Sequence, residues 1–126
     1  MIKDKTVLIT GSTGGLGKKL VDGFLNEGFN VICLCRNLIK KKKFFLKKNR
    51  RKIKLINIDL TNFVELKKTL ISNLKNVKKI DVLINNAGIG QGSIIEMTSI
   101  NKIKEVFDIN FFAQIQITQI LLKYLK

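Results

Sequence analysis

Thr10-Gly11-Ser12-Thr13-Gly14-Gly15-Leu16-Gly17 is the most informative segment of the chain. It follows a short apolar run, Val7-Leu8-Ile9, and it opens a segment whose apolar side chains recur at helical spacing. A glycine-rich turn between a buried strand and a helix suits a phosphate, because glycine permits a sharp turn and a close approach without a Cβ. The N–H groups of the first helical turn then face the anion. We therefore predict a nucleotide-binding loop here, since the strand and the helix that it requires flank it.

Strand-like and helix-like segments alternate along the rest of the chain. Short links between alternating elements predict an α/β fold of the Rossmann type, a doubly wound parallel sheet with helices on both faces. Right-handed crossovers give the strand order 3-2-1-4 and place the pocket at the carboxyl ends of the first and fourth strands. Gly28 is expected to end the first helix in the left-handed conformation. We expect strands at about 6–10, 31–35, 53–58 and 82–84, and helices at about 16–26, 38–48, 63–74 and 99–126.

The composition is that of one globular domain spanning residues 1–126, with 45% hydrophobic residues and no proline, repeat or linker. No apolar stretch approaches the roughly 20 residues that a membrane span needs, and the charged N-terminus leads into a strand rather than a secretory signal. Cys33 and Cys35 are interpreted as buried thiols of a protein in the reducing cytoplasm. Because the chain contains no histidine, we expect no metal site built from cysteine and histidine.

The formal net charge of +15 is concentrated between residues 36 and 54. One interpretation of the basic cluster Lys40–Lys54 is a nucleic-acid footprint. We favour a solvated helix and loop in a lysine-rich sequence, because almost no aromatic residues are interleaved for stacking on bases. The charge would also attract an anionic cofactor.

Four motifs, in order along the chain, resemble the short-chain dehydrogenase/reductase family. They are the pattern Thr10-Gly-x-x-x-Gly15-x-Gly17, Asp59-Leu60 after the third strand, Asn85-Asn86-Ala87-Gly88 after the fourth, and Asn110 in the last helix. The resemblance extends over the whole chain but covers only the first half of the family's usual domain. It implies a domain that is incomplete after the fourth strand and its following long helix.

The resemblance also implies roles for individual residues. Asp59 would accept a hydrogen bond from the adenine amino group, and the backbone of Leu60 would lie against the adenine ring. Asn86, Ala87 and Gly88 would line the adenosine ribose and the path to the nicotinamide. Each of these residues also has a structural alternative. Asp59 is a plausible helix-start residue, Asn86 would tie strand ends together through its amide, and Gly88 would serve in a plain turn. The pyrophosphate would be held by the loop residues Gly11, Ser12, Thr13, Gly14, Gly15, Leu16 and Gly17.

The end of the second strand predicts the choice of cofactor. An NAD-binding fold places a carboxylate there for the ribose hydroxyls, whereas this chain has Arg36 and Asn37. A guanidinium binds a 2′-phosphate with paired, charge-assisted hydrogen bonds, so NADP(H) is favoured and NAD(H) is the alternative. Gly14 departs from this pattern, because many NADP-using family members carry a second basic residue there.

The resemblance implies hydride transfer between a nicotinamide and a carbonyl or secondary alcohol. Family members use a Ser and a Tyr followed four residues later by a Lys, which lowers the pKa of the phenol. Here the single tyrosine, Tyr124, has no such lysine, and only Asn110 of the family's catalytic group is present. An alternative role for Asn110 is that of a polar residue that bends a long helix. We expect residues 1–126 to bind NADP(H) without turning substrate over.

Apolar side chains cover much of the circumference of the expected last helix. Ile109, Phe112, Ala113 and Ile117 belong to its inward stripe, whereas others lie off this stripe. A solitary surface helix has a polar side, so we expect a homo-oligomer or a further segment to cover this helix. Two alternatives to an enzyme remain, a non-catalytic dinucleotide-binding or regulatory module and a nucleic-acid-binding protein.

Overall fold

The computed structural model describes residues 5–37, 45 and 52–125. Its sheet has four strands, all parallel, in the order β3-β2-β1-β4, which confirms the expected topology. The expected bounds hold to within one residue at each strand end. The strands are β1 (Thr6–Thr10), β2 (Asn30–Cys35), β3 (Ile53–Asn57) and β4 (Val82–Ile84).

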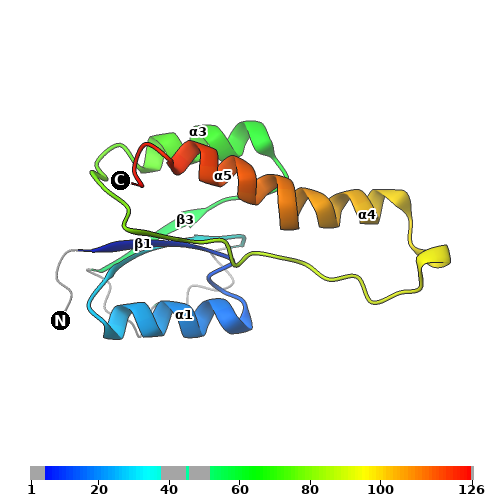
Figure 1. The fold of residues 1–126 in the computed structure, drawn as a ribbon, viewed down its shortest axis with the longest axis horizontal. Helices are drawn as coiled ribbons and strands as arrows, with labels where there is room; N and C mark the ends of the chain where they lie inside the picture. The colour runs from blue at the N-terminus through cyan, green and yellow to red at the C-terminus, as the bar shows by residue number, and fades with distance from the viewer. Residues whose placement is uncertain (1–4, 38–44, 46–51, 126) are drawn as a thin grey trace.

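Helices cover both faces of this sheet (Figure 1). Helix α1 (Gly15–Asn26) lies on one face, and α3 (Phe63–Asn73) and α5 (Ala113–Leu121) lie on the other. A short 3₁₀ turn, η2 (Ile95–Met97), leads into α4 (Ile100–Phe107), which extends beyond the sheet. Within the described parts of the chain, no helix has both the length and the apolar character needed to cross a membrane.

The sheet is buried on both faces, as central parallel strands require. In β1, Val7 and Ile9 pack toward α1, whereas Leu8 packs toward α3 and α5, and none of the three is exposed to solvent. The expected cationic helix at 38–48 lies outside the described residues except for Phe45. Phe45 is buried in the cluster on the α1 side.

Helix α1 ends as the sequence predicts. Gly28 has φ +91°, its N–H donates to the carbonyl of Leu25, and the N–H of Phe29 donates to the carbonyl of Phe24. These two bonds form a Schellman motif, which the edge-to-face contact of Phe24 and Phe29, with ring centroids 5.0 Å apart, completes. Gly28 thus turns the chain from α1 into β2.

The expected continuous helix over 99–126 is wrong in its interior. A π-helical turn, η3 (Asp108–Phe112), separates α4 from α5, and α5 ends at Leu121. A π turn contains more residues than an α turn, so the side chains beyond it change direction. Phe112, expected in the core, is therefore 50% exposed, whereas Ile109 and Ala113 are buried.

Candidate functional site

An open cleft of about 330 Å³ lies at the carboxyl ends of the strands, where the strand order reverses. The loop between β1 and α1 forms one wall, and the segment after β4 faces it. Most of the residues that the sequence assigns to the site meet here. Those lining the cleft are Gly11, Thr13, Gly14, Gly15, Leu16, Gly17, Arg36, Asp59, Leu60, Asn86, Ala87 and Gly88.

The glycines of the loop divide into two kinds. Gly11 has φ +63°, and a Cβ on it would lie 2.8 Å from the Cα of Ala87, while a Cβ on Gly17 would lie 2.1 Å from the carbonyl oxygen of Gly11. The fold itself requires these two glycines. A Cβ on Gly15 would meet no atom within 4 Å, and one on Gly14 would make only ordinary contact. At Gly14 and Gly15, the missing side chains leave room in the cleft for a ligand.

The amino end of α1 is prepared for an anion. Its N-cap, Gly14, provides no side-chain hydrogen bond, and the first turn contains no acidic residue. By contrast, Asn62 accepts a hydrogen bond from the N–H of Glu65 at the start of α3, and Ser99 caps α4 in the same way. The uncapped amides and the helix dipole of α1 therefore favour a negatively charged ligand in the cleft.

Thr10 and Asn86 hold the two walls of the cleft together. The hydroxyl oxygen of Thr10 accepts hydrogen bonds from the N–H groups of Asn86 and Ala87, at 3.0 and 2.8 Å. The amide nitrogen of Asn86 donates to the carbonyls of Thr10 and Gly11, at 3.0 and 3.2 Å. The Asn86 side chain thus makes the tie between strand ends that the sequence left as an alternative, while the residue also lines the cleft.

Gln114 is a buried polar residue of this network that the sequence analysis missed. Its amide nitrogen donates to the carbonyls of Ala87 and Ile109, and its oxygen lies 3.3 Å from the Thr10 hydroxyl. Gln114 thereby joins α5 to the ends of β1 and β4. The available signal was a glutamine directly after Ala113, which belongs to the expected inward stripe of the last helix.

Thr10→Val is expected to lower the free energy of unfolding by about 2 kcal/mol at nearly constant side-chain volume, because it leaves the half-buried N–H of Ala87 without its acceptor and removes one of the two acceptors of the Asn86 N–H. Thr10→Ser keeps the hydroxyl and is the matched control, with an expected loss of less than about 1 kcal/mol. Urea unfolding followed by circular dichroism measures both. Equal losses in the two variants would contradict the role of the hydroxyl.

Arg36 directly follows β2, Asp59 follows β3 by two residues, and both line the cleft. The N–H and the hydroxyl of Thr61 both donate to Oδ1 of Asp59, at 2.9 and 2.7 Å. These two bonds and, to a smaller degree, the Arg36 guanidinium hold the pKa of Asp59 below its ordinary value of 3.8. Asp59 is therefore ionised at neutral pH and starts the turn before α3. The residue that caps α3 is Asn62, so Asp59 orders the turn before the helix and does not cap the helix itself.

The lowered pKa of Asp59 makes its contribution to stability depend on pH. Because the folded pKa lies below the unfolded one, the stabilisation is present above pH 3.8 and is lost as the pH falls through the folded pKa. Asp59→Asn is expected to be slightly less stable than the native chain at pH 7 and equally stable well below the folded pKa. Urea midpoints measured from pH 2 to 7 test this, and a difference that is constant with pH would contradict it.

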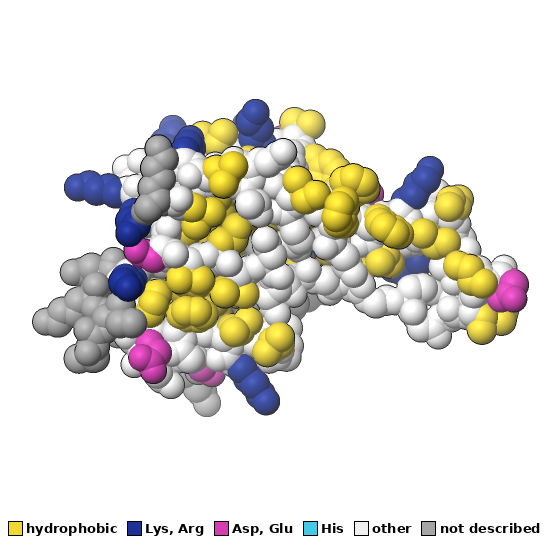
Figure 2. All heavy atoms as spheres, viewed as in Figure 1, with side chains coloured by type: hydrophobic (Ala, Val, Ile, Leu, Met, Phe, Trp, Pro, Cys, Tyr) yellow, Lys and Arg dark blue, Asp and Glu magenta, His cyan; other side chains and the backbone are white. Residues whose placement is uncertain are grey.

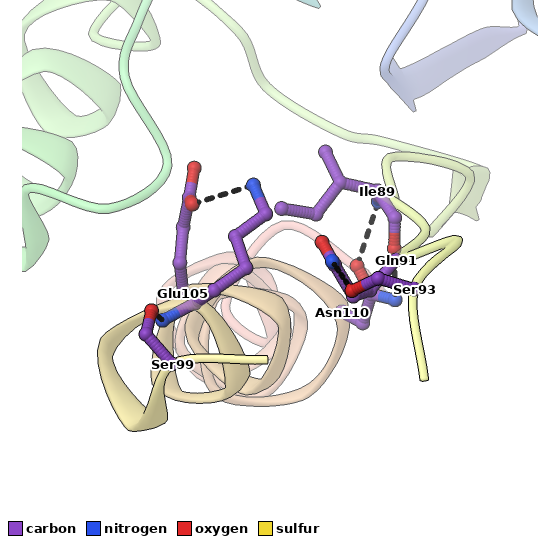
Figure 3. Close-up of polar contacts among 7 residues, drawn as sticks. Ile89, Gln91, Ser93, Ser99, Glu105 and Asn110 are labelled. Atoms are coloured by element: carbon purple, nitrogen blue, oxygen red, sulfur yellow. Dashed lines mark hydrogen bonds and ion pairs between the residues drawn. The ribbon is translucent and has the colours of Figure 1, made fainter. Parts of the chain in front are cut away.

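Three residues assigned to the site do not line the cleft. The hydroxyl of Ser12 is buried and donates to the carbonyl of Leu34 at 3.3 Å, whereas Asn37 follows Arg36 with a left-handed φ of +54°. Asn110 pairs its amide with the backbone of Ile89, accepting from the N–H at 2.8 Å and donating to the carbonyl at 2.9 Å (Figure 3). It sits inside the π turn, so Asn110 fixes the loop after β4 against the last helical segment.

The cleft also contains apolar residues for which no role was predicted. Ile58, Ile89 and Ile109 line it, together with Leu34 and Cys35 at the end of β2. The ends of the strands provide most of these side chains, so their place follows from the sheet order. Both cysteines are buried and neither forms a disulfide, and burial raises the pKa of Cys33 to about 12, so this thiol is inert at neutral pH.

Comparison with known sequences supports one family. The profile described as short chain dehydrogenase matches residues 5–126. The chain is 32% identical over 119 residues to the probable short-chain type dehydrogenase/reductase VdlC of Helicobacter pylori, covering 94% of this chain and 42% of VdlC. It is 28% identical over 120 residues to the NADPH-dependent 3-dehydrocapnine reductase of Ornithobacterium rhinotracheale, covering 91% and 41%. The chain thus spans about two fifths of the length of these relatives.

Solved structures of low sequence identity share the fold. A short-chain dehydrogenase/reductase from Brucella melitensis superposes with a TM-score of 0.88 at 23% identity, covering 97% of this chain and 50% of that one. The NADPH-bound carbonyl reductase from chicken fatty liver gives 0.83 at 24% identity, covering 98% and 49%. The 3-ketoacyl-(acyl-carrier-protein) reductase of B. melitensis, complexed with NADH, gives 0.84 at 21%, covering 95% and 50%.

Proposed function

Because the chain belongs to the short-chain dehydrogenase/reductase family, we propose that its cleft binds NADP(H) for hydride transfer to or from a small carbonyl or alcohol. The uncapped amino end of α1 carries this proposal, with the open space at Gly14 and Gly15 before it. A pyrophosphate there receives backbone N–H groups and meets no Cβ. Elsewhere in the cleft, Oδ2 of Asp59 would accept a hydrogen bond from the adenine amino group, and the backbone of Leu60 would contact the adenine ring.

We propose NADP(H) as the preferred cofactor because Arg36, directly after β2, lines the cleft and the next residue, Asn37, is not a carboxylate. A 2′-phosphate would pair with the guanidinium, whereas NAD(H) would leave this cation without a phosphate. Of the matched structures, the carbonyl reductase is bound to NADPH and the 3-ketoacyl-(acyl-carrier-protein) reductase is complexed with NADH, so the relatives support both forms of the cofactor. The argument for the phosphorylated form therefore depends on Arg36.

The nicotinamide supplies the hydride when the cofactor is bound. Asn110 and Ile89 would position the loop beside the nicotinamide end, since Ile89 lines the cleft and its backbone is held by the Asn110 amide. Tyr124 is unsuited to give the proton because of its position. Its backbone carbonyl accepts a hydrogen bond from the N–H of Ile80, just before the amino end of β4. That is the opposite end of the sheet from the cleft. We propose that residues 1–126 bind the cofactor but do not turn substrate over.

The last helical segments support a proposed association with a second copy of the chain. Phe107, Phe111, Phe112, Ile115 and Leu122 are all more than two fifths exposed on α4, η3 and the region of α5. Figure 2 shows apolar side chains gathered along this part of the surface. Contiguous apolar surface of this kind is typical of an interface. The two buried cysteines form no disulfide, which is consistent with a proposed place in the cytoplasm.

One experiment tests binding and turnover together. Fluorescence titration of the 126-residue chain with NADPH is expected to give saturable binding. A steady-state assay with small aldehydes and ketones is expected to show no carbonyl-dependent oxidation of NADPH. An unsaturable titration would contradict the cofactor site. Carbonyl-dependent oxidation would contradict only the proposal that these residues are inactive alone.

A further inference from the structure

A basic groove of about 360 Å³ lies at the amino ends of the strands, the end of the sheet opposite the cofactor cleft. The first residues of β1, β2 and β3 and the segment 76–79 line it. Four of the lining residues are lysines, and no carboxylate is among them. Figure 2 shows basic side chains gathered at this end of the molecule, with acidic side chains near them. The four lysines are Lys52, Lys54, Lys78 and Lys79.

Two of these ammonium groups are held in place by helix ends. Lys52 donates from Nζ to the carbonyl of Gly28 at 2.8 Å, just beyond α1, and Lys54 donates to the carbonyl of Asn73, the last residue of α3. Carboxyl ends of helices carry a partial negative charge, which stabilises both cations there. An ammonium group has three N–H donors, so each of these bonds leaves two for another acceptor. Both lysines are half-buried, which restricts their side chains before any ligand binds.

The groove has a deficit of negative charge. Asp81, whose side chain is 15% exposed, pairs with Lys79 at 2.8 Å and accepts from the N–H of Thr6 at 2.9 Å. These contacts hold the pKa of Asp81 below its ordinary value, so it is ionised at neutral pH. Lys78 is exposed and makes no ion pair with any described residue. Among the residues that the structure describes, one carboxylate therefore faces the four lysines of the groove, and an anion would relieve their mutual repulsion.

We propose that this groove is a second anion site, distinct from the cofactor cleft, and that it binds a chain of phosphates. Lysine is a point-charge donor suited to phosphate oxygens, and the two half-buried ammonium groups are already positioned. A single phosphate carries at most about two negative charges, whereas a triphosphate offers charges and acceptors spaced along a groove. The proposal is independent of the proposed function, because no residue of the groove lines the cleft.

Calorimetric titration of the 126-residue chain at low ionic strength tests the proposal, with inorganic tripolyphosphate and adenosine triphosphate as separate probes. The double variant Lys52→Gln/Lys78→Gln is expected to weaken the binding of at least one probe about tenfold, roughly threefold for each of the two cations removed. The control Lys67→Gln/Lys104→Gln removes two exposed lysines from α3 and α4 and is expected to change affinity less than about twofold. Arg36→Gln, in the cofactor cleft, is likewise expected to change the affinity for either probe less than about twofold.

Lys78→Gln alone keeps the test valid if the double variant fails to fold, because the exposed Lys78 side chain makes no described ion pair. An equal loss in the control variant would overturn the site, since it would indicate general electrostatic attraction. A loss confined to Arg36→Gln would place the phosphates in the cofactor cleft and overturn it as well. Hexaglutamate is expected to bind at least tenfold more weakly than tripolyphosphate, and equal affinity would overturn the assignment to phosphate.

Discussion

Gly17→Ala is expected to destabilise the protein by about 3 kcal/mol or more and to abolish NADPH binding. The new Cβ would lie 2.1 Å from the carbonyl oxygen of Gly11 and 2.9 Å from the Cα of Ser12. Both are backbone atoms, which cannot move aside as a side chain can. The loop must therefore shift, and the amino end of α1 shifts with it. Urea unfolding and NADPH titration measure the two effects.

Gly15→Ala is the matched control, because its Cβ would meet no atom of the protein within 4 Å. Alanine is the better helix former, so stability is expected to stay the same or to rise by less than about 1 kcal/mol. The added methyl group would stand in the cleft, and NADPH affinity is expected to fall nonetheless. If Gly15→Ala binds NADPH as tightly as the native chain, the pyrophosphate does not approach the loop at this residue.

Arg36→Asp is expected to reverse the coenzyme preference. Loss of the guanidinium removes the charge-assisted pair with the 2′-phosphate, and the new carboxylate repels that phosphate while accepting from ribose hydroxyls. We expect NADPH to bind about 100-fold more weakly, corresponding to about 2.7 kcal/mol, and NADH to bind more tightly. Parallel fluorescence titrations with the two coenzymes give both dissociation constants.

Lys19→Asp is the control for Arg36→Asp, because it makes the same change in net charge at an exposed residue of α1 that does not line the cleft. At physiological salt, a distant charge is largely screened, so the ratio of the two dissociation constants is expected to change less than about twofold. An equal shift in both variants would show that the preference depends on overall charge rather than on Arg36.

The variants Gly17→Ala and Arg36→Asp separate a failure of the proposed cofactor site from a failure of the proposed phosphate groove. Gly17→Ala and Arg36→Asp act at the carboxyl ends of the strands, whereas Lys52 and Lys78 lie at the amino ends. A chain that loses NADPH binding but keeps tripolyphosphate binding would establish two independent anion sites.

Local sequence signals were sufficient for the elements and their order. The apolar runs at 6–10 and 82–84 match β1 and β4 residue for residue, because β-branched and apolar residues bounded by turn residues have few other structures available. Gly28 was identifiable as a left-handed cap because a positive φ strongly favours glycine. Short connections and crossover handedness then left one strand order, and that order brings Arg36 and Asp59 to the cleft.

Tertiary structure alone decided which side chains hold the cleft together. Thr10 contacts Gln114 across 104 residues of sequence and Asn86 across 76, and no local pattern specifies such pairs. The π turn that exposes Phe112 likewise depends on packing. The apolar pattern of residues 99–126 predicts one uninterrupted α-helix. In the structure, the wider π turn lies at 108–112, where the Asn110 side chain accepts a hydrogen bond from the N–H of Ile89. The sequence determined the sheet and the phosphate loop through local preferences, and long-range hydrogen bonding determined the shape of the site.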